Sequence, residues 1–297
     1  MRILIYGKNG WICSLMQNVL DKKKADYVYS QVRADNYNDV VNEVLDVNPT
    51  HLMSFIGRTH GEGIITIDYL EDKTKLNINV RDNLYAPMVL AEAAKKYDIH
   101  LSYLGTGCIF TYDEIHEFGN ENTGFTEDDI PNFTGSAYST VKGYTDQLMQ
   151  FNPNVLTLRI RMPISSVSNS RNFINKITKY KKICSIPNSM TVLDDFLPII
   201  LDMAKNNITG IYNFTNPGLI THNEILQMYK DIVDPDFTWK NFTLEEQAEI
   251  LKADRSNNCL DTNKIQNLYP NLKNIKDSVR DVLHKMNGDD KNNCSLC

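Results

Sequence analysis

Apolar runs and amphipathic patterns alternate along the first half of the chain. Short runs rich in β-branched and aromatic residues, such as "RILIYG" at 2–7 and "HLSYLG" at 100–105, are typical of buried strands. Between such runs lie segments with apolar residues at helical spacing, among them "WICSLMQNVLDKK" and "VRDNLYAPMVLAEAAKKYDI". Apolar strands separated by helices indicate parallel β–α–β units that are covered on both faces. We therefore predict an α/β fold with a doubly wound parallel sheet of the Rossmann type.

The second half of the chain contains fewer patterns of this kind. "NVLTLRIRMP" and "GIYNFTNP" are typical of strands, and "DDFLPIILDMAKNN" between them is typical of a helix. The rest is richer in asparagine and indicates short helices and loops. We predict a Rossmann domain at 1–163 to which 191–216 returns, a smaller discontinuous lobe at 164–286, and a polar tail at 287–297.

Composition and charge narrow the classes of partner. Of the 297 residues, 42% are hydrophobic and 23% are charged, which is ordinary for a globular protein. The net charge of -6 argues against a nucleic-acid partner, because it indicates no strongly basic face. No apolar run approaches the roughly 20 residues that span a bilayer, so no membrane partner is expected. The chain enters a strand pattern directly after Met1 and has six cysteines without a disulfide spacing, which predicts a cytoplasmic protein with reduced thiols.

A glycine turn, "YGKNGWICS", joins the first predicted strand to the first predicted helix. A dinucleotide site needs a tight turn at the strand end, close approach of backbone to the pyrophosphate, and a free helix N-terminus. Such a pattern is weak alone, but its place in a β–α–β unit makes it strong. Cys13 stands where a third small glycine is usual. We expect the cofactor contacts in this turn to be Gly7, Asn9, Gly10, Trp11 and Ile12.

The end of the second strand bears on the choice between NAD and NADP. A carboxylate there would bind the ribose 2′-hydroxyl, but "YVYSQVRADN" has Arg33 and no acid before Asp35. Arg33 could bind a 2′-phosphate by charge-assisted hydrogen bonds. The alternative is that Arg33 is a solvated surface residue. The pattern favours NADPH as the cofactor.

A tyrosine and a lysine lie four residues apart in "FTGSAYSTVKGYTDQLM". On a helix, Tyr138 and Lys142 leave the same face. An adjacent ammonium is expected to lower the pKa of the phenol, which could then donate a proton to a ketone oxygen as hydride arrives at carbon. Thr106, at the end of the preceding strand, could share the hydrogen bond to that oxygen. A helical Y-x-x-x-K is often only a solvated face, but its occurrence with the glycine turn and Thr106 favours catalysis.

These residues give the chain a family resemblance. The glycine turn, Thr106, Tyr138 and Lys142 resemble the extended short-chain dehydrogenase/reductases, and "GTGCIFTYDE" and "DRSNNCLDTNKI" resemble the dTDP-4-dehydrorhamnose reductases among them. "YGKNGWI", "EDDIPNFTGSAYS", "RIRMPIS", "IPNSMTVLDDFLPI" and "NFTLEEQA" are more closely similar to the bifunctional UDP-4-keto-6-deoxyglucose 3,5-epimerase/4-reductases of UDP-L-rhamnose synthesis. The resemblance spans about residues 1–285. It departs at Cys13 and in the stretch 57–75.

The resemblance implies a second chemistry in the same pocket. An epimerase must remove a proton from carbon beside the ketone and return one on the opposite face. Cys108, in "GTGCIF", matches the cysteine of related epimerase/reductases, and Lys176, in "SRNFINKITKYKK", matches the lysine proposed as the acid. Alternatively, Cys108 is a small buried hydrophobe and Lys176 is one of four solvated lysines.

Further residues are expected to contact the cofactor and the substrate. The expected cofactor contacts are Ile56, Gly57, Asn83, Tyr138, Lys142, Met162, Pro163 and Ile164; of these, the residues at 162–164 would wall the nicotinamide and Asn83 would help to orient the tyrosine. The expected contacts to the nucleotide diphosphate of the substrate are Asn172, Arg255 and Asn257. No histidine spacing indicates a metal site.

The function predicted from these residues is a bifunctional one. We predict an NADPH-dependent enzyme that converts UDP-4-keto-6-deoxyglucose to UDP-L-rhamnose, working as a homodimer downstream of a separate 4,6-dehydratase. The alternatives are a 4-ketosugar reductase without epimerase activity and a non-catalytic NADP-binding regulatory subunit. The choice between UDP and dTDP stays open.

Overall fold

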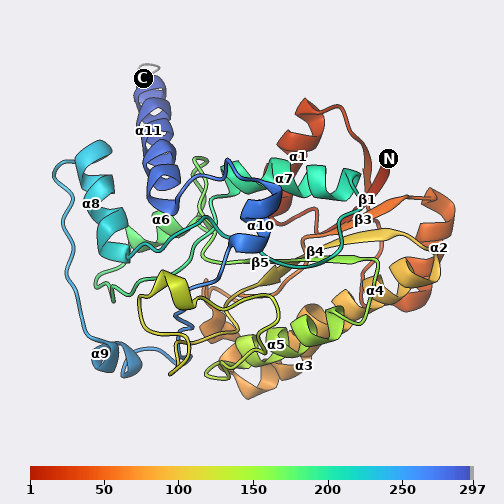
Figure 1. Cartoon of the computed structure of the whole chain (residues 1–297), viewed down its shortest axis with the longest axis horizontal. Helices are drawn as coiled ribbons and strands as arrows, with labels where there is room; N and C mark the ends of the chain where they lie inside the picture. Colours follow the sequence, from red (N-terminus) through yellow and green to blue (C-terminus); the bar gives the residue numbers. More distant parts are fainter. Residues whose placement is uncertain (295–297) are drawn as a thin grey trace.

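A parallel sheet forms the centre of the computed structural model, which describes residues 1–294 (Figure 1). Its strand order is β2-β1-β3-β4-β5-β6, and all neighbouring strands are parallel. The strands are β1 (Arg2–Tyr6), β2 (Asp26–Tyr29), β3 (His51–Ser54), β4 (His100–Thr106), β5 (Val155–Ile160) and β6 (Gly210–Asn213). The doubly wound sheet predicted from the apolar runs is confirmed.

Helices cover both faces of this sheet (Figure 1). Side chains alternate along β1, so that Ile3 and Ile5 enter one hydrophobic core while Leu4 and Tyr6 enter the other. The first core is closed by α1 (Trp11–Lys22) and α7 (Leu193–Lys205). The second is closed by α2 (Tyr37–Val47), α4 (Ala86–Lys96) and the end of α5 (Ala137–Met149). Both faces are therefore buried, as continuous apolar strands require.

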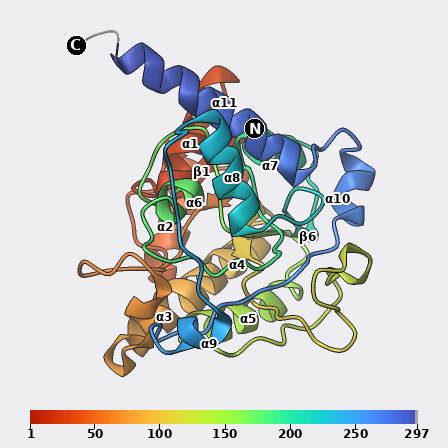
Figure 2. The same ribbon diagram turned by 90° about the vertical axis from the view of Figure 1, so that its left-hand side faces the viewer.

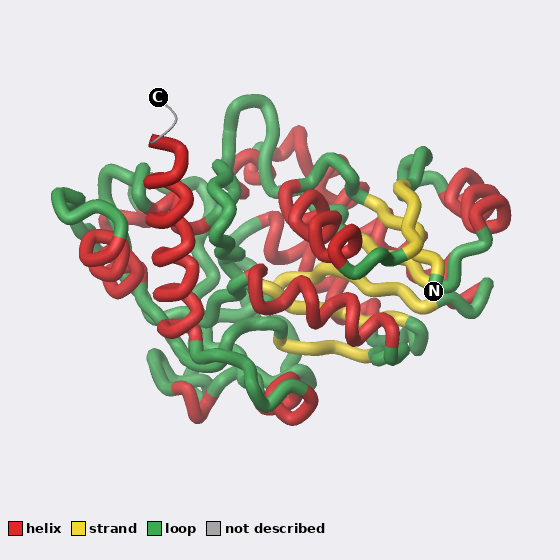
Figure 3. Tube along the Cα trace, turned by 90° about the horizontal axis from the view of Figure 1, so that it is seen from above, coloured by secondary structure: helices red, strands yellow, loops and turns green. Residues whose placement is uncertain are grey.

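A third hydrophobic core lies beside the sheet, away from the N-terminus (Figure 3), and its helices face the viewer in Figure 2. It is built from isoleucine, leucine, valine and methionine side chains of α6 (Phe173–Ile177), α8 (His222–Ile232) and α11 (Ile275–Cys294). The short helices α9 (Leu244–Ala248) and α10 (Asn263–Leu268) connect this part. Helix α11 continues through Cys294, into the segment predicted as a polar tail, and Cys297 lies outside the described residues.

The segment between β3 and α4 differs from the single long helix that the sequence predicted. It contains 3₁₀ turns at Ile67–Glu71 and Lys73–Lys75, then α3 (Leu76–Val80), a π-helical turn at Arg81–Tyr85, and finally α4. A further 3₁₀ turn lies at Glu121–Thr123. Single π turns inside helices frequently occur at functional sites. Within residues 1–294, every helix is too short or too polar to span a bilayer.

The strand order places a ligand crevice at one edge of the sheet. From β1 the chain proceeds to β2 on one side and to β3 on the other, so the order reverses between β1 and β3. In open parallel sheets, ligands bind outside the carboxyl ends of the strands at such a reversal. Gly7 follows β1, and Ile56 and Gly57 follow β3, so the predicted cofactor residues lie at this crevice.

Candidate active site

The glycine turn after β1 has the geometry that its sequence predicted. Gly7 has φ +99°, and a Cβ there would lie 3.0 Å from the backbone carbon of Phe55. A Cβ on Gly10 would lie 3.1 Å from the carbonyl oxygen of Gly7. The Gly10 N–H donates to that oxygen at 2.9 Å and closes the turn. Larger residues would therefore clash with backbone, and the turn leaves its own backbone open to a ligand.

The N-terminus of α1 fits the diphosphate of a dinucleotide. No acidic side chain lies in its first turn, and no side chain caps its free N–H groups. The indole Nε1 of Trp11 is buried without a partner among residues 1–294. Free N–H groups at the positive end of a helix bind phosphate oxygens, and a buried unpaired donor needs an acceptor from a ligand. The predicted contacts around Gly10 and Trp11 therefore suit a dinucleotide.

Arg33 lies in a surface cluster of charges. It forms an ion pair with Asp35 at 2.8 Å, while its side chain remains 66% exposed. Arg81 contacts Asp35 at 3.3 Å and Asp82 at 2.8 Å, and Arg58 contacts Asp82 at 2.9 Å. Three guanidinium groups thus share two carboxylates, which leaves net positive charge for a 2′-phosphate.

Asn83 holds the loop that follows β3. Its side chain is fully buried, accepts from the Arg58 N–H at 2.8 Å and donates to the Arg58 carbonyl at 2.9 Å. Its own carbonyl accepts from the Thr145 hydroxyl of α5 at 2.6 Å. Asn83 therefore fixes the loop against the helix that carries Tyr138. The predicted help in orienting the tyrosine can therefore act through this helix.

The predicted threonine and tyrosine lie together at the carboxyl end of β4. Helix α5 begins at a cap in which the Ser136 hydroxyl accepts from the Ser139 N–H at 3.0 Å, and Tyr138 lies in the first turn. The hydroxyl group of Thr106 lies close enough to the phenol of Tyr138 to act on its pKa. The Cys108 N–H donates to the Thr106 hydroxyl at 3.1 Å, so cysteine, threonine and phenol form one group.

The pKa of the phenol differs from the prediction. Burial and the nearby Cys108 raise the pKa of Tyr138, whereas an adjacent ammonium was expected to lower it. The amine of Lys142 instead donates to the hydroxyl of Tyr103 and lies 4.6 Å from the centroid of that ring. Burial lowers the pKa of Lys142 to about 8, against a smaller opposite effect of Asp146. Tyr138 is therefore held protonated, which suits a proton donor.

Lys176 lies on α6, at the border of the third core. Burial and the positive charge of Arg171 lower its pKa. No carboxylate within the described chain lies at ion-pair distance from Lys176 or Arg171. A lysine whose pKa is lowered in this way can release a proton nearer to neutral pH. Cys108 is a free, partly exposed thiol at the end of β4.

The three residues predicted to bind the substrate diphosphate are engaged inside the chain. Asn172 is fully buried, and its amide donates to the carbonyls of Ser165 and Val167 at 2.6 and 3.2 Å. Arg255 pairs with Asp68 at 2.7 Å. The amide oxygen of Asn257 accepts from Asn188 at 2.9 Å. In this structure the three side chains stabilise loops. Every polar atom of the Asn172 side chain is hydrogen-bonded within the chain, so none is free for a ligand.

The predicted nicotinamide wall divides between two environments. Met162 has φ +39°, a left-handed conformation that residues other than glycine adopt at a cost. Met162 and Pro163 are partly exposed at the end of β5. Ile164 is fully buried in the third core, against which Met162 also packs. Met162 and Pro163 therefore offer exposed side-chain surface for the wall, and the contact of Ile164 stays a prediction.

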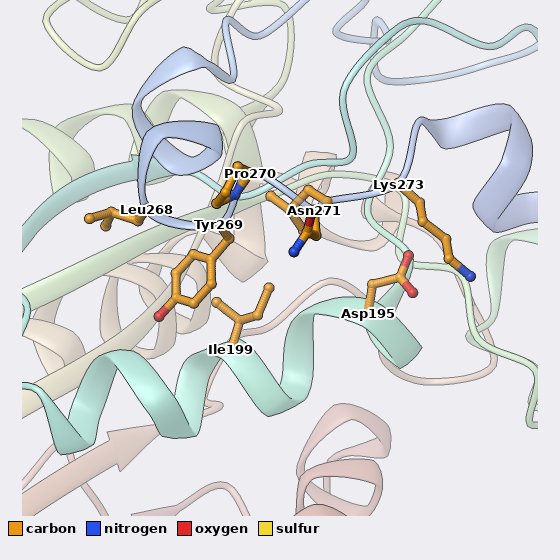
Figure 4. Close-up of a pocket in the computed structure, with 8 residues that line it drawn as sticks. Asp195, Ile199, Leu268, Tyr269, Pro270, Asn271 and Lys273 are labelled. Atoms are coloured by element: carbon orange, nitrogen blue, oxygen red, sulfur yellow. The ribbon is translucent and has the colours of Figure 1, made fainter.

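A separate surface pocket of about 400 Å³ lies between α7 and the segment after α10 (Figure 4). Three of its polar side chains are already paired: Asp195 accepts from Ser278, Lys273 contacts Asp281, and Tyr269 donates to Asp202. None of the predicted site residues lines it. Within residues 1–294, no three histidine, cysteine or acidic side chains are grouped as metal ligands.

Comparison with known proteins decides the family. The chain is 54% identical over 287 residues to protein L780 of Acanthamoeba polyphaga mimivirus, covering 96% of this chain and 99% of L780. The crystal structure of L780, a UDP-rhamnose synthase, matches at a TM-score of 0.93 and 53% identity, with 96% of this chain and 99% of L780 covered. A bifunctional dTDP-4-dehydrorhamnose 3,5-epimerase/reductase of Arabidopsis thaliana is 47% identical, covering 93% of this chain and 90% of the plant protein. The chain belongs to the bifunctional 3,5-epimerase/4-reductases of rhamnose synthesis.

A further relative matches this chain over less than half of its own length. A trifunctional Arabidopsis thaliana enzyme, named as a UDP-glucose 4,6-dehydratase/3,5-epimerase/reductase, is 45% identical over 94% of this chain but only 41% of its own length. No family model matches the chain.

The structure of this epimerase/reductase also reveals residues that the sequence did not single out. Tyr103 accepts the hydrogen bond from Lys142, and Asp146 forms a buried ion pair with Arg159 at 2.6 Å. The sequence offered one signal for the first of these contacts. Tyr103 carries a hydroxyl in a strand that is buried on both faces, and a buried hydroxyl needs a hydrogen-bond partner.

A second group lies in the stretch that departs from the family pattern. His60 contacts Arg171, although the two are 111 residues apart in the sequence. Spacing along the chain gave no signal for this pair.

Proposed function

We propose that this epimerase/reductase converts UDP-4-keto-6-deoxyglucose to UDP-L-rhamnose with NADPH. The observation that carries the proposal is the group at the end of β4, where the Thr106 hydroxyl lies beside the Tyr138 phenol and accepts from the Cys108 N–H. A reductase needs the first two residues, whereas the thiol beside them serves an epimerase. A relative named UDP-rhamnose synthase matches 96% of this chain, which supports both the reduction and the epimerisation.

The reduction uses the phenol as a proton donor. Tyr138 donates its proton to the sugar O4, and Thr106 gives the same oxygen a second hydrogen bond. Bound NADPH supplies the hydride that reaches C4. Burial raises the pKa of Tyr138, so the phenol keeps its proton until O4 becomes basic. The cation of Lys142, held by Tyr103, favours the phenolate that remains.

Epimerisation precedes reduction, because it depends on the ketone. The C4 carbonyl acidifies the hydrogens at C3 and C5, and Tyr138 stabilises the enolate oxygen. The thiolate of Cys108 takes the proton from carbon, and the ammonium of Lys176 returns one on the opposite face. Solvent then restores both groups, so deuterium from D2O should enter both carbons. The lowered pKa of Lys176 supports its role as the acid.

The finer assignments of substrate and pathway belong to the same proposal. UDP is favoured because L780 is named for UDP, although the plant bifunctional relative is named for dTDP. A 4,6-dehydratase must supply the ketosugar, and the trifunctional plant relatives carry that activity by name in a longer chain. We assign residues 164–286, apart from the returning segment 191–216, to the substrate lobe. We also propose that the protein works in the cytoplasm.

A homodimer is part of the proposal. On α5, Tyr144 and Leu148 share one face at helical spacing and are 60% and 43% exposed. Phe151, just beyond the end of this helix, and Tyr85 are 75% and 50% exposed. Such an apolar face is typical of an interface. Light scattering of the Phe151→Asp variant should report a monomer where the parent protein is a dimer; a dimeric variant or a monomeric parent would contradict the interface.

Solvent exchange tests the double activity. The ketosugar is incubated in D2O with the enzyme but without NADPH, and deuterium at C3 and C5 is followed by NMR. We expect exchange at both carbons, and UDP-L-rhamnose after NADPH is added. Reduction without exchange would leave only a 4-ketosugar reductase. NADPH binding without either reaction would indicate a regulatory subunit.

A further inference from the structure

His60 lies where the loop after β3 meets the segment before α6. A guanidinium nitrogen of Arg171 contacts the Nε2 of His60, and a second one lies 3.4 Å from the hydroxyl of Thr59. The loop itself is fixed, because Asn83 binds both backbone groups of Arg58. The contact therefore joins a rigid loop of the sheet to the residues that lead to Lys176.

The contact fixes the tautomer of the histidine. A guanidinium has donors only, so the Nε2 of His60 must accept the hydrogen bond. Burial and the positive charges of Arg171, Arg58 and Lys176 lower the pKa of His60, which keeps the ring neutral. The single proton of the neutral ring must then be on Nδ1. That atom is buried and has no partner among residues 1–294.

The charges around this N–H all have one sign. Arg171, Arg58 and Lys176 act on the ring, and no carboxylate is among these neighbours. Asp82 neutralises Arg58 at 2.9 Å, but in the described chain no acidic side chain is within ion-pair distance of Arg171 or Lys176. The two half-buried cations and the unpaired N–H thus have no anionic partner in the described chain, so a ligand must supply one.

We propose that His60 and Arg171 form a pocket for a diphosphate oxyanion at the sugar end of the active site. The inference rests on the proposed function, which brings two diphosphates to this cleft: that of the nucleotide sugar and that of the cofactor. Arg171 binds phosphoryl oxygens through its remaining N–H groups, and His60 donates through Nδ1. The predicted ligand Asn172 is the neighbour of Arg171 in the sequence, but its own amide is engaged with backbone.

Binding of UDP, uridine and NADP⁺ by calorimetry tests the pocket and identifies its ligand. We expect Arg171→Gln to weaken UDP binding by about tenfold or more and uridine binding hardly at all, because the lost bonds are charge-assisted. The Lys181→Gln variant is the matched control, since it removes one exposed charge from the same part of the chain. Weaker NADP⁺ binding instead of weaker UDP binding would assign the pocket to the cofactor diphosphate.

The histidine is tested by a pair of variants. The amide N–H of asparagine lies near the position of Nδ1, so His60→Asn should keep UDP affinity within about threefold, while His60→Ala loses about tenfold. Unchanged UDP and NADP⁺ binding in Arg171→Gln would overturn the pocket. Equal losses in His60→Asn and His60→Ala would overturn the role of Nδ1. A parent protein that binds neither UDP nor NADP⁺ would instead contradict the proposed function itself.

Discussion

The two groups of residues that we assign to reduction and to epimerisation are built differently. Thr106, Tyr138 and Lys142 stand on a strand of the sheet and on a long helix packed against it, and the Thr106 hydroxyl and the Lys142 amine have partners in the chain. Cys108 lies just past a strand end, and Lys176 lies on the five-residue helix α6 without an acidic partner in the described chain. The difference teaches that the fold holds the reductase group in place by itself, whereas the group assigned to epimerisation stands on shorter elements and keeps an unpaired charge.

Replacing the phenol should have the largest effect. We expect Tyr138→Phe to slow NADPH oxidation by about 10²–10⁴-fold, the usual contribution of a positioned general acid. Exchange of C3 and C5 protons should fall less, because Thr106 still contacts the enolate oxygen. NADPH absorbance and NMR of exchange measure the two rates. Tyr97→Phe, at the end of α4 and outside both the site and the proposed interface, is the control. Equal losses in both reactions would show that the halves are not separable.

Replacing the thiol should impair epimerisation and leave reduction nearly unchanged. We expect Cys108→Ser to lower deuterium incorporation at C3 and C5 by about 100-fold or more, because serine is a far weaker carbon base at neutral pH. Reduction of the already epimerised 4-ketosugar should stay within about threefold of the parent rate. Cys184→Ser, a buried free cysteine elsewhere, is the control. Exchange at the parental rate would remove Cys108 from the mechanism.

The buried ammonium of the reductase half should reduce stability. The pKa of Lys142 falls from 10.5 to about 8 on folding, so the unfolded chain binds more protons between these pH values and parental stability rises with pH there. Lys142→Met should therefore raise the free energy of unfolding by about 1–3 kcal/mol at pH 7 and progressively less as the pH approaches the usual lysine value.

Urea unfolding at several pH values measures this gain. Lys179→Met, on an exposed lysine near α6, controls for loss of a charge. A variant less stable than the parent at pH 7 would mean that the contact with Tyr103 outweighs burial.

The smallest effect is expected from the partner of that ammonium. Tyr103→Phe removes the acceptor of the Lys142 hydrogen bond, so the charged amine loses stabilisation and its pKa falls further. The alkaline limb of the reduction rate should move to lower pH by about half a unit, with a loss of a few fold at neutral pH. C3 and C5 exchange should keep its profile. An unmoved limb would show that burial alone sets the pKa of Lys142.

The sequence predicted what depends on local pattern. Apolar runs located the strands, and the glycine turn and the Tyr138–Lys142 spacing located a site at strand ends that the sheet brings together. The direction of the pKa shift at Tyr138 was wrong, because it depends on burial and on where the amine of Lys142 points.

Long-range contacts were beyond the same reasoning. The His60–Arg171 contact depends on how two distant segments pack. The side chain of Asn172, an expected substrate contact, binds local backbone, as asparagine often does before a helix, and no sequence pattern indicated this engagement.

The hydrogen bonds of Asn83 have a mechanical consequence. Its side chain holds the loop that follows β3, while its carbonyl holds Thr145, less than one helical turn beyond Lys142. This loop and the helix that carries Tyr138 are thereby clamped as a single rigid block. Damage to this clamp should appear as slow turnover at saturating cofactor, because the contacts that we predict to the cofactor diphosphate lie at the distant glycine turn.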